Sequence, residues 1–265
     1  MQKKIFLIFP ALFYLDSLAQ KTIDGLINAE KSFAAFSVTH STKEAFLKFL
    51  DSSGIVFDQG KPVNGFEFWN KREKRPGILN WSPQYAGISA SGDLGFTSGP
   101  WTFQQTSKDT VIARGQYTTV WHINKNGEWK FLVDLGVNHT QANPDTSLTI
   151  FKKNSKVKEG DLKSLLKTEE KFIASGNDPG YVYKKYLSPI AVLNRNDLPP
   201  QYAQWNPDSF PQNIQYTING SGIALSGDLG YVYGTTIING KTDNYLRIWR
   251  KEKEGWKTAL EVLRY

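Results

Sequence analysis

The feature that most constrains the fold of this chain is an internal repeat. The segment SGDLGFTSG, residues 91–99, recurs as SGDLGYVYG at residues 226–234, a spacing of 135 positions. Three longer pairs of similar segments recur in the same order: residues 29–36 with 168–175, residues 46–65 with 182–201, and residues 117–136 with 245–264. Shared order over most of the chain indicates a tandem duplication, and each copy is long enough to have its own hydrophobic core.

Each copy has the pattern of helices followed by an antiparallel sheet. In the first copy, an apolar stripe with helical spacing runs through residues 23–36. Further helical segments are expected around residues 46–50 and 66–69, with a short strand, GIVF, between them. The strands that follow are separated by the hairpin signals Gly92-Asp93 and Lys-Asn-Gly. This order predicts the α+β class, with two tandem domains.

The predicted domains span residues 20–137 and 161–265, and a polar linker at residues 138–160 joins them. Within the linker, the segment SLTIF is compatible with a short added strand. The repeated Gly-Asp-Leu-Gly turns contain Asp93 and Asp228. We interpret both as structural turn residues rather than ligand-binding residues, because aspartate caps its own backbone and glycine tolerates a positive φ.

Residues 1–19 have the composition of a secretory signal peptide. Two lysines precede an apolar run at residues 5–15, and the small residues Ser17 and Ala19 precede the expected cleavage site. An uncleaved anchor is the less favoured alternative, because the run is shorter than the ~20 residues that a spanning helix needs. We therefore expect an exported bacterial protein, periplasmic or extracellular, with no membrane segment after cleavage.

Composition excludes several kinds of site. The chain has no cysteine, which rules out disulfides, thiol catalysis and cysteine-ligated metals. Its three histidines are not clustered, so we expect neither a metal nor a cofactor. The net charge of +7 is spread along the chain, and the basic clusters at residues 71–75 and 152–158 are interpreted as solvated surface charge. No nucleic-acid-binding motif is present.

The repeated patterns resemble those of a known superfamily. Helix, helix and strand are followed by SGDLGYxxG and then by YxxxWxxxxxGxWKxxxDxG, and this order is similar to that of nuclear-transport-factor-2-like proteins. The polyketide-cyclase-like and ketosteroid-isomerase-like branch, much of it of unknown function, is the most similar. The resemblance covers residues 24–137 and 162–263. It implies two cone-shaped domains, each a curved antiparallel sheet wrapped around N-terminal helices that leave a pocket, and it does not determine activity.

The resemblance also implies one catalytic candidate. The isomerases have a general-base aspartate just after the first short strand, and IVFDQGKPVNG places Asp58 there. They also need an oxyanion hole, but the first helix here offers no tyrosine and the strand near Thr119 carries no second acid. Steroid-type isomerisation is therefore not expected. In the second copy, Asn194 is expected at the place of Asp58, and asparagine cannot act as a base.

Two further polar residues in the strands are candidates. His122 is a candidate general base, and Asp134 lies in an apolar strand, where burying an unpaired acid is costly. Asp134 is therefore expected to face solvent, to bond backbone donors or to line the pocket. In the second copy, Arg250 and Glu261 are expected at the corresponding positions.

Aromatic residues are the stronger indication of a binding site. Concave pockets rich in aromatic side chains suit apolar rings or sugars, although any single tryptophan is more often part of the core. The candidates in the first copy are Trp69, Trp81, Tyr85, Trp101 and Trp121. The candidates in the second copy are Trp205, Tyr233 and Trp249.

Three functional hypotheses follow. The favoured one is non-enzymatic binding of a small, partly apolar ligand in the pocket of the first copy. The second is an enzyme of the lyase, cyclase or isomerase type that uses Asp58 as base, with His122 or Tyr85 as donor. The third is a structural or association module. In each case the two copies are expected to pack against each other as an intramolecular pseudo-dimer.

Overall fold

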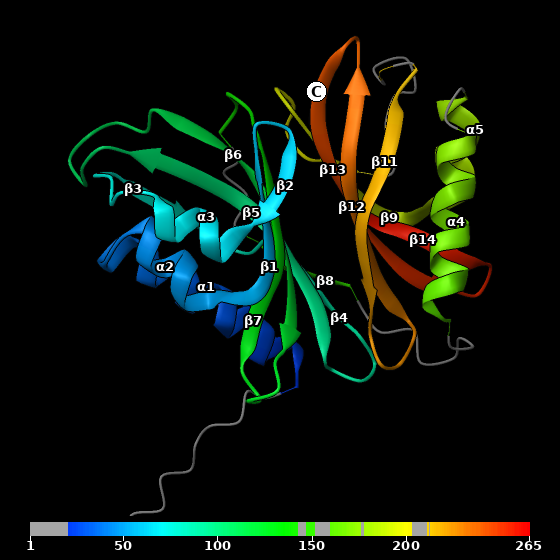
Figure 1. Ribbon diagram of the computed structural model, residues 1–265, viewed down its shortest axis with the longest axis horizontal. Helices are drawn as coiled ribbons and strands as arrows, with labels where there is room; N and C mark the ends of the chain where they lie inside the picture. The colour runs from blue at the N-terminus through cyan, green and yellow to red at the C-terminus, as the bar shows by residue number, and fades with distance from the viewer. Residues whose placement is uncertain (1–20, 143–146, 152–159, 176–177, 203–210, 212) are drawn as a thin grey trace, which may run out of the picture.

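The computed structural model describes residues 21–142, 147–151, 160–175, 178–202, 211 and 213–265 (Figure 1). The predicted signal peptide at residues 1–19 and the candidate Trp205 lie outside the described residues. We call residues 21–151 the first half of the chain and residues 160–265 the second half. None of the helices formed by the described residues is long and apolar enough to cross a membrane.

The described residues of the first half form three helices and a sheet of eight strands. The helices are α1 (Ile23–Thr39), α2 (Thr42–Phe49) and α3 (Gly65–Lys71). The strands are β1 (Leu50–Asp58), β2 (Lys61–Asn64), β3 (Ile78–Trp81), β4 (Tyr85–Ile88), β5 (Leu94–Gln104), β6 (Ala113–Ile123), β7 (Trp129–Asn138) and β8 (Thr149–Phe151). The sheet order is β2-β1-β7-β6-β5-β4-β8, and β3 pairs with β5. Strand β8, inside the expected linker, pairs with β4 in parallel.

In the second half, two helices and a sheet of six strands are formed by the residues that the structure describes. The helices are α4 (Leu162–Ala174) and α5 (Pro179–Tyr186). The strands are β9 (Leu187–Arg195), β10 (Gln201–Tyr202), β11 (Gln215–Ile223), β12 (Leu229–Ile238), β13 (Lys241–Glu252) and β14 (Gly255–Leu263). The sheet order is β10-β9-β14-β13-β12-β11, which repeats the order of the first half. The predicted α+β class, with one sheet in each half, is confirmed.

Side-chain caps explain where the long helices begin. The Thr22 hydroxyl accepts a hydrogen bond from the backbone N–H of Gly25 at 3.1 Å, which satisfies one of the unpaired donors at the start of α1. In the second half, Asp161 and Ser164 form a reciprocal capping box at the start of α4. The two capped helices occupy equivalent places at the beginning of each repeat.

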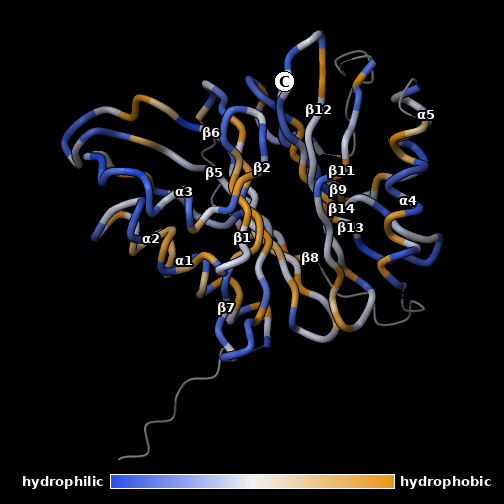
Figure 2. The backbone as a smooth tube through the Cα atoms, in the orientation of Figure 1, coloured by the Kyte–Doolittle hydropathy of each residue, from blue (hydrophilic) through white to orange (hydrophobic). Residues whose placement is uncertain are grey.

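The two sheets lie between two layers of helices. Figure 1 shows α1, α2 and α3 on the outer side of the first sheet, and α4 and α5 on the outer side of the second. One hydrophobic core contains residues of both halves, including Val120 and Leu135 from the first and Val192 and Leu246 from the second. Hydrophobic stretches accordingly concentrate on the strands at the centre of the molecule (Figure 2). Each half also has a separate core between its own helices and sheet.

The repeated Ser-Gly-Asp-Leu-Gly turns contact each other. The hydroxyl groups of Ser91 and Ser226 lie 2.8 Å apart, and each accepts a hydrogen bond from the other residue's backbone N–H at 3.1 Å. Asp93 accepts from the N–H of Leu225 at 3.0 Å, and Asp228 accepts from the N–H of Ala90 at 3.0 Å. The two copies of the motif thus form a reciprocal contact between the halves.

Candidate functional site

A cavity of about 290 Å³ lies between the helices and the sheet of the first half. Its walls are mostly aromatic and aliphatic, and α1, α2 and strands β3, β5, β6 and β7 supply them. The lining residues are Phe33, Phe46, Leu79, Trp81, Trp101, Tyr117, Asp134, Gly136 and Asn138. Three residues proposed from the sequence, Trp81, Trp101 and Asp134, are therefore brought together at this cavity.

Asp134 provides the charged group of the cavity wall. It lies on β7 directly opposite Thr119 of β6, whose hydroxyl donates a hydrogen bond to Asp134 Oδ2 at 2.7 Å. Burial raises the pKa of Asp134 from its ordinary 3.8 to about 6, and the bond from Thr119 offsets part of that effect. No ion pair of Asp134 occurs among the described residues.

A second acid, Glu30 of α1, lies behind the cavity wall and is fully buried. The indole N–H groups of Trp81 and Trp121 donate to it at 2.5 and 2.9 Å, and the hydroxyl of Thr97 donates to it as well. Burial raises the pKa of Glu30 to about 7, although these three donors favour the ionised form. One acid, Asp134, thus lines the cavity, and a second acid, Glu30, is buried behind its wall; burial raises the pKa of both.

Sequence reasoning missed Glu30. A signal was nevertheless present, because Glu30 lies three positions after Ile27 and three before Phe33, on the apolar stripe of its helix. A charged residue at that place must be exposed, paired or functional.

Tyr117 of β6 contributes an aromatic ring to the cavity wall. The residue is 6% exposed, and its hydroxyl oxygen has almost no accessible surface. Burial raises the pKa of this hydroxyl well above its ordinary value, so the side chain is neutral at physiological pH.

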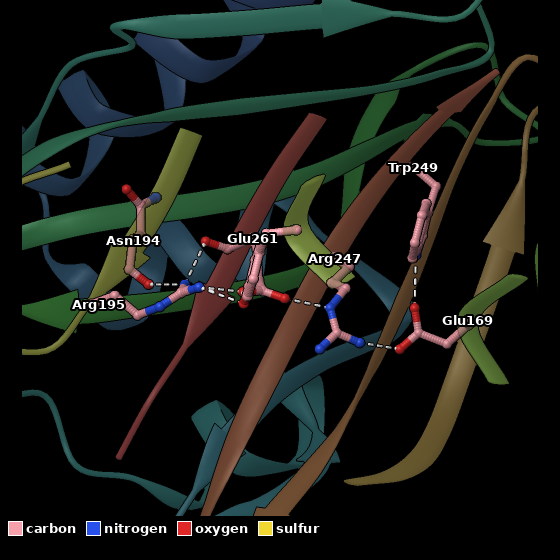
Figure 3. Close-up of polar contacts among 7 residues, drawn as sticks. Glu169, Asn194, Arg195, Arg247, Trp249 and Glu261 are labelled. Carbon is pink, nitrogen blue, oxygen red and sulfur yellow. Dashed lines mark hydrogen bonds and ion pairs between the residues drawn. The ribbon is translucent and has the colours of Figure 1, made fainter. Parts of the chain in front are cut away.

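In the second half, a network of ionic side chains lies in the corresponding interior. Arg247 of β13 is fully buried and forms ion pairs with Glu169 of α4 and Glu261 of β14 (Figure 3). Arg195 of β9 also pairs with Glu261, and the hydroxyl of Tyr183 donates to this acid at 2.6 Å. Burial opposes ionisation of Glu261, but the two arginines outweigh it and lower its pKa. Glu261, a candidate ligand-binding residue, thus belongs to this network.

Trp121 and Trp249 are fully buried and do not line the first-half cavity. Each donates its indole N–H to the buried acid of its own half. Trp121 contacts Glu30, and Trp249 contacts Glu169 at 2.8 Å. Both tryptophans therefore position acids rather than present a surface to a ligand.

The other aromatic candidates lie elsewhere. Tyr85 is buried, and its hydroxyl lies 2.5 Å from that of Tyr202, in the contact between the halves. The ring centroids of Tyr233 and Phe57 lie 5.9 Å apart, also in the interface between the halves. Trp69 of α3 packs on Phe46 at 4.4 Å, behind the cavity wall.

Asp58 and His122 lie outside the first-half cavity. The Asp58 side chain is 39% exposed at the end of β1 and forms an ion pair with Arg72 at 3.3 Å. His122 Nε2 lies 2.9 Å from Asp51 Oδ2, in a polar depression with a volume of about 540 Å³. Neither residue is placed to act on a molecule bound in the cavity.

The strand register corrects the expected equivalence of Asn194 and Asp58. Two register pairs occupy matching places in the two sheets: Ile55 with Val133, and Val192 with Leu260. Counting from these pairs, Asp58 corresponds to Arg195 and not to Asn194, which is one residue earlier in the chain. A difference of one residue places a side chain on the other face of a sheet. Asn194 accordingly faces the first half and donates to Ser98 at 3.2 Å and to Thr118 at 3.3 Å.

Within the described part of the chain, no group of three or more His, Asp or Glu side chains is arranged to hold a metal ion. The lining of the cavity combines a mostly apolar wall with the polar residues Asp134 and Asn138.

Comparisons with known proteins concern the fold. No protein-family model matches the chain, and no curated protein matches it. A solved ketosteroid-isomerase-like protein from Parabacteroides distasonis is similar over 46% of this chain and 90% of its own, with 16% identity and a TM-score of 0.34.

Two further solved structures are similar at the same level. A nuclear-transport-factor-2-like protein of unknown function from Shewanella oneidensis covers 43% of this chain and 96% of its own, with 16% identity and a TM-score of 0.35. A nuclear-transport-factor-2-like protein from Cytophaga hutchinsonii covers 38% of this chain and 93% of its own, with 15% identity and a TM-score of 0.32. The chain resembles nuclear-transport-factor-2-like proteins, as its repeated motifs predict.

Proposed function

We propose that the protein binds a small, partly apolar molecule in the cavity of the first half. The observation that carries this proposal is an aromatic-walled cavity that has the carboxyl-bearing residue Asp134 among its lining residues. Ligand sites of proteins combine mostly apolar walls with a few placed polar groups in this way. The volume, about 290 Å³, is near the lower end of such sites, so the ligand is small.

The position of Asp58 disfavours the enzymatic alternative. A general base must come within hydrogen-bond reach of the proton that it removes. Asp58 is partly exposed and paired with Arg72, and it is not among the residues of the cavity wall. A binding role therefore accounts better for this arrangement.

We also propose that the two halves, each a cone-shaped unit, act as a fixed intramolecular pseudo-dimer. The shared hydrophobic core and the reciprocal bonds between the Ser91 and Ser226 turns support this. Export from a bacterial cell through residues 1–19 stays a prediction, which N-terminal sequencing of the secreted protein would test.

Binding can be tested by a thermal-shift screen of the full chain with small aromatic and aliphatic compounds, both neutral and charged. A compound present at 100 times its Kd should stabilise the protein by about 2.7 kcal/mol. Trp101→Ala should abolish the shift, because Trp101 lines the cavity, and Asp58→Asn should leave it unchanged. A shift that is lost with Asp58→Asn and kept with Trp101→Ala would place the site elsewhere and refute the proposal.

A further inference from the structure

The two halves of the chain provide an internal comparison, because the strand registers match. Thr119 of β6 pairs with Asp134 of β7, and Arg247 of β13 pairs with Glu261 of β14. In each half, the strand register shifts at a β-bulge after the next residue: between Val120 and Trp121 in the first half, and between Ile248 and Trp249 in the second. Thr119 therefore occupies in the first half the position that Arg247 occupies in the second.

Acids and aromatic rings surround the guanidinium group of Arg247. Glu169 and Glu261 form ion pairs with it on two sides (Figure 3). Three aromatic rings surround the guanidinium carbon: Phe172 at 3.8 Å, Tyr216 at 4.6 Å and Tyr245 at 4.7 Å. Cations are attracted to aromatic faces at such distances, and most strongly when both are removed from water.

The acids of this site have counterparts in the first half. Glu30 corresponds to Glu169, because each accepts a hydrogen bond from the equivalent tryptophan, Trp121 or Trp249. Asp134 corresponds to Glu261 by the strand register.

The aromatic rings have counterparts too. Phe33 contacts Trp121 edge-on at 6.1 Å, as Phe172 contacts Trp249 at 5.9 Å. Register places Trp81 where the second half has Tyr216, and Tyr117 where it has Tyr245. All three rings of the first half line the cavity.

What the first half lacks is the cation and some of the side-chain volume. Threonine replaces Arg247, and Gly136, which lines the cavity, takes the register position of the fully buried Leu263. The cavity thus coincides with the place that larger side chains fill in the other copy.

The missing cation accounts for the difference between Asp134 and its counterpart Glu261. Arginines hold the pKa of Glu261 low in the second half, whereas burial raises the pKa of Asp134, which has no ion pair among the described residues, to about 6. Burial also raises the pKa of Glu30 to about 7, and it raises the pKa of its counterpart Glu169 even beside Arg247. The titratable groups that face this space come from α1 (Glu30), β6 (Tyr117) and β7 (Asp134), and among the described lining residues none is basic.

We propose that the first-half cavity binds an organic cation, a small molecule with an alkylguanidinium or alkylammonium group, in the place that the Arg247 side chain occupies in the second half. This inference rests on the proposed function, namely that the cavity is a ligand site. The carboxyl group of Asp134 pairs with the cation, Phe33, Trp81 and Tyr117 surround it, and the apolar side chains of the cavity contact its alkyl chain.

The test is calorimetric titration of the full chain at pH 8 with n-propylguanidinium, n-propylammonium and the neutral isostere n-propylurea. Propylguanidinium should bind at least tenfold more tightly than propylurea. Its affinity should fall as the pH is lowered through about 7 and then about 6, because protonation of Glu30 and then of Asp134 removes the charge that attracts it.

Variants locate the site. Asp134→Asn should weaken propylguanidinium binding at least tenfold, and Thr119→Arg, which supplies a guanidinium from the chain itself, should abolish it. Asp58→Asn makes the same change of charge outside the cavity and should leave the affinity unchanged. If Thr119→Arg does not fold, Asp134→Asn still decides the outcome.

The possible failures are distinguishable. Equal binding of propylurea and propylguanidinium, with both lost in Trp101→Ala, would overturn the cation inference and leave the proposed ligand site standing. Binding of propylguanidinium that is unchanged in Asp134→Asn would also overturn it. If the cations do not bind and neither propylurea nor any compound of the thermal-shift screen binds, the proposed function and this inference both fail.

Discussion

Replacement of Glu30 by glutamine is expected to change how the free energy of unfolding depends on pH. Burial raises the pKa of Glu30 from its ordinary value of 4.5 to about 7 in the folded protein. Below pH 4.5 the carboxyl group is protonated in both states, so its contribution to stability is fully present there. Between pH 4.5 and 7 the unfolded chain releases the proton first, and stability is lost as the pH rises.

The size of this effect follows from the two pKa values. The interval from 4.5 to about 7 corresponds to a loss of about 3 kcal/mol of unfolding free energy above pH 7. Glutamine cannot ionise, so the unfolding free energy of Glu30→Gln should lack this decrease. The difference between variant and wild type should therefore shift by about 3 kcal/mol in favour of the variant between pH 4.5 and pH 8.

Equilibrium unfolding in urea at several values of pH measures the effect. Urea is preferable to guanidinium chloride, because guanidinium would compete for the proposed cation site. Glu67→Gln is a matched control, because it makes the same substitution at a helical side chain that is 70% exposed. A difference between Glu30→Gln and wild type that stays constant from pH 4.5 to 8 would refute the argument, whatever the absolute stability of the variant.

Two further predictions concern the second half and the contact between the halves. Arg247→Met should lower the unfolding free energy by about 3–5 kcal/mol, because it leaves Glu169 and Glu261 buried without their shared cation. Arg72→Met, which breaks an exposed ion pair, should lower it by less than about 1 kcal/mol. Urea denaturation measures both losses, and losses of similar size would contradict this prediction. Asp93→Ala and Asp228→Ala should each lower the unfolding free energy by about 1 kcal/mol. The loss in the double mutant should differ from the sum of the two single losses, because both residues belong to one reciprocal contact between the halves. Strictly additive losses in a double-mutant cycle would contradict this prediction.

Much of the fold could be predicted from the sequence. The duplication, the α+β order and the hairpin turns at Asp93 and Asp228 all depend on residues close together in the chain. Such local signals are visible without knowledge of the tertiary contacts, because turn chemistry and the periods of helix and strand act over a few residues. The partner of each turn, by contrast, is the other turn, which is 135 positions away.

The candidate site was only partly predictable. Trp81, Trp101 and Asp134 were proposed from their types and positions, and they do line the cavity. The alignment of Asn194 with Asp58 was wrong by one residue, because segment similarity does not determine strand register. That one residue decides which face of the sheet a side chain occupies.

By itself, the sequence determined that this chain is a tandem pair of α+β units, each beginning with helices and ending in an antiparallel sheet. Only the tertiary structure decided that a cavity of the first half lies where the second half has an ion-pair network. This outcome depends on side chains from separate elements meeting in one place: Arg247 lies between two acids in the second half, while threonine takes its register position in the first half and Gly136 lines the cavity. Close packing makes that difference, since the volume of a single side chain determines whether a space remains.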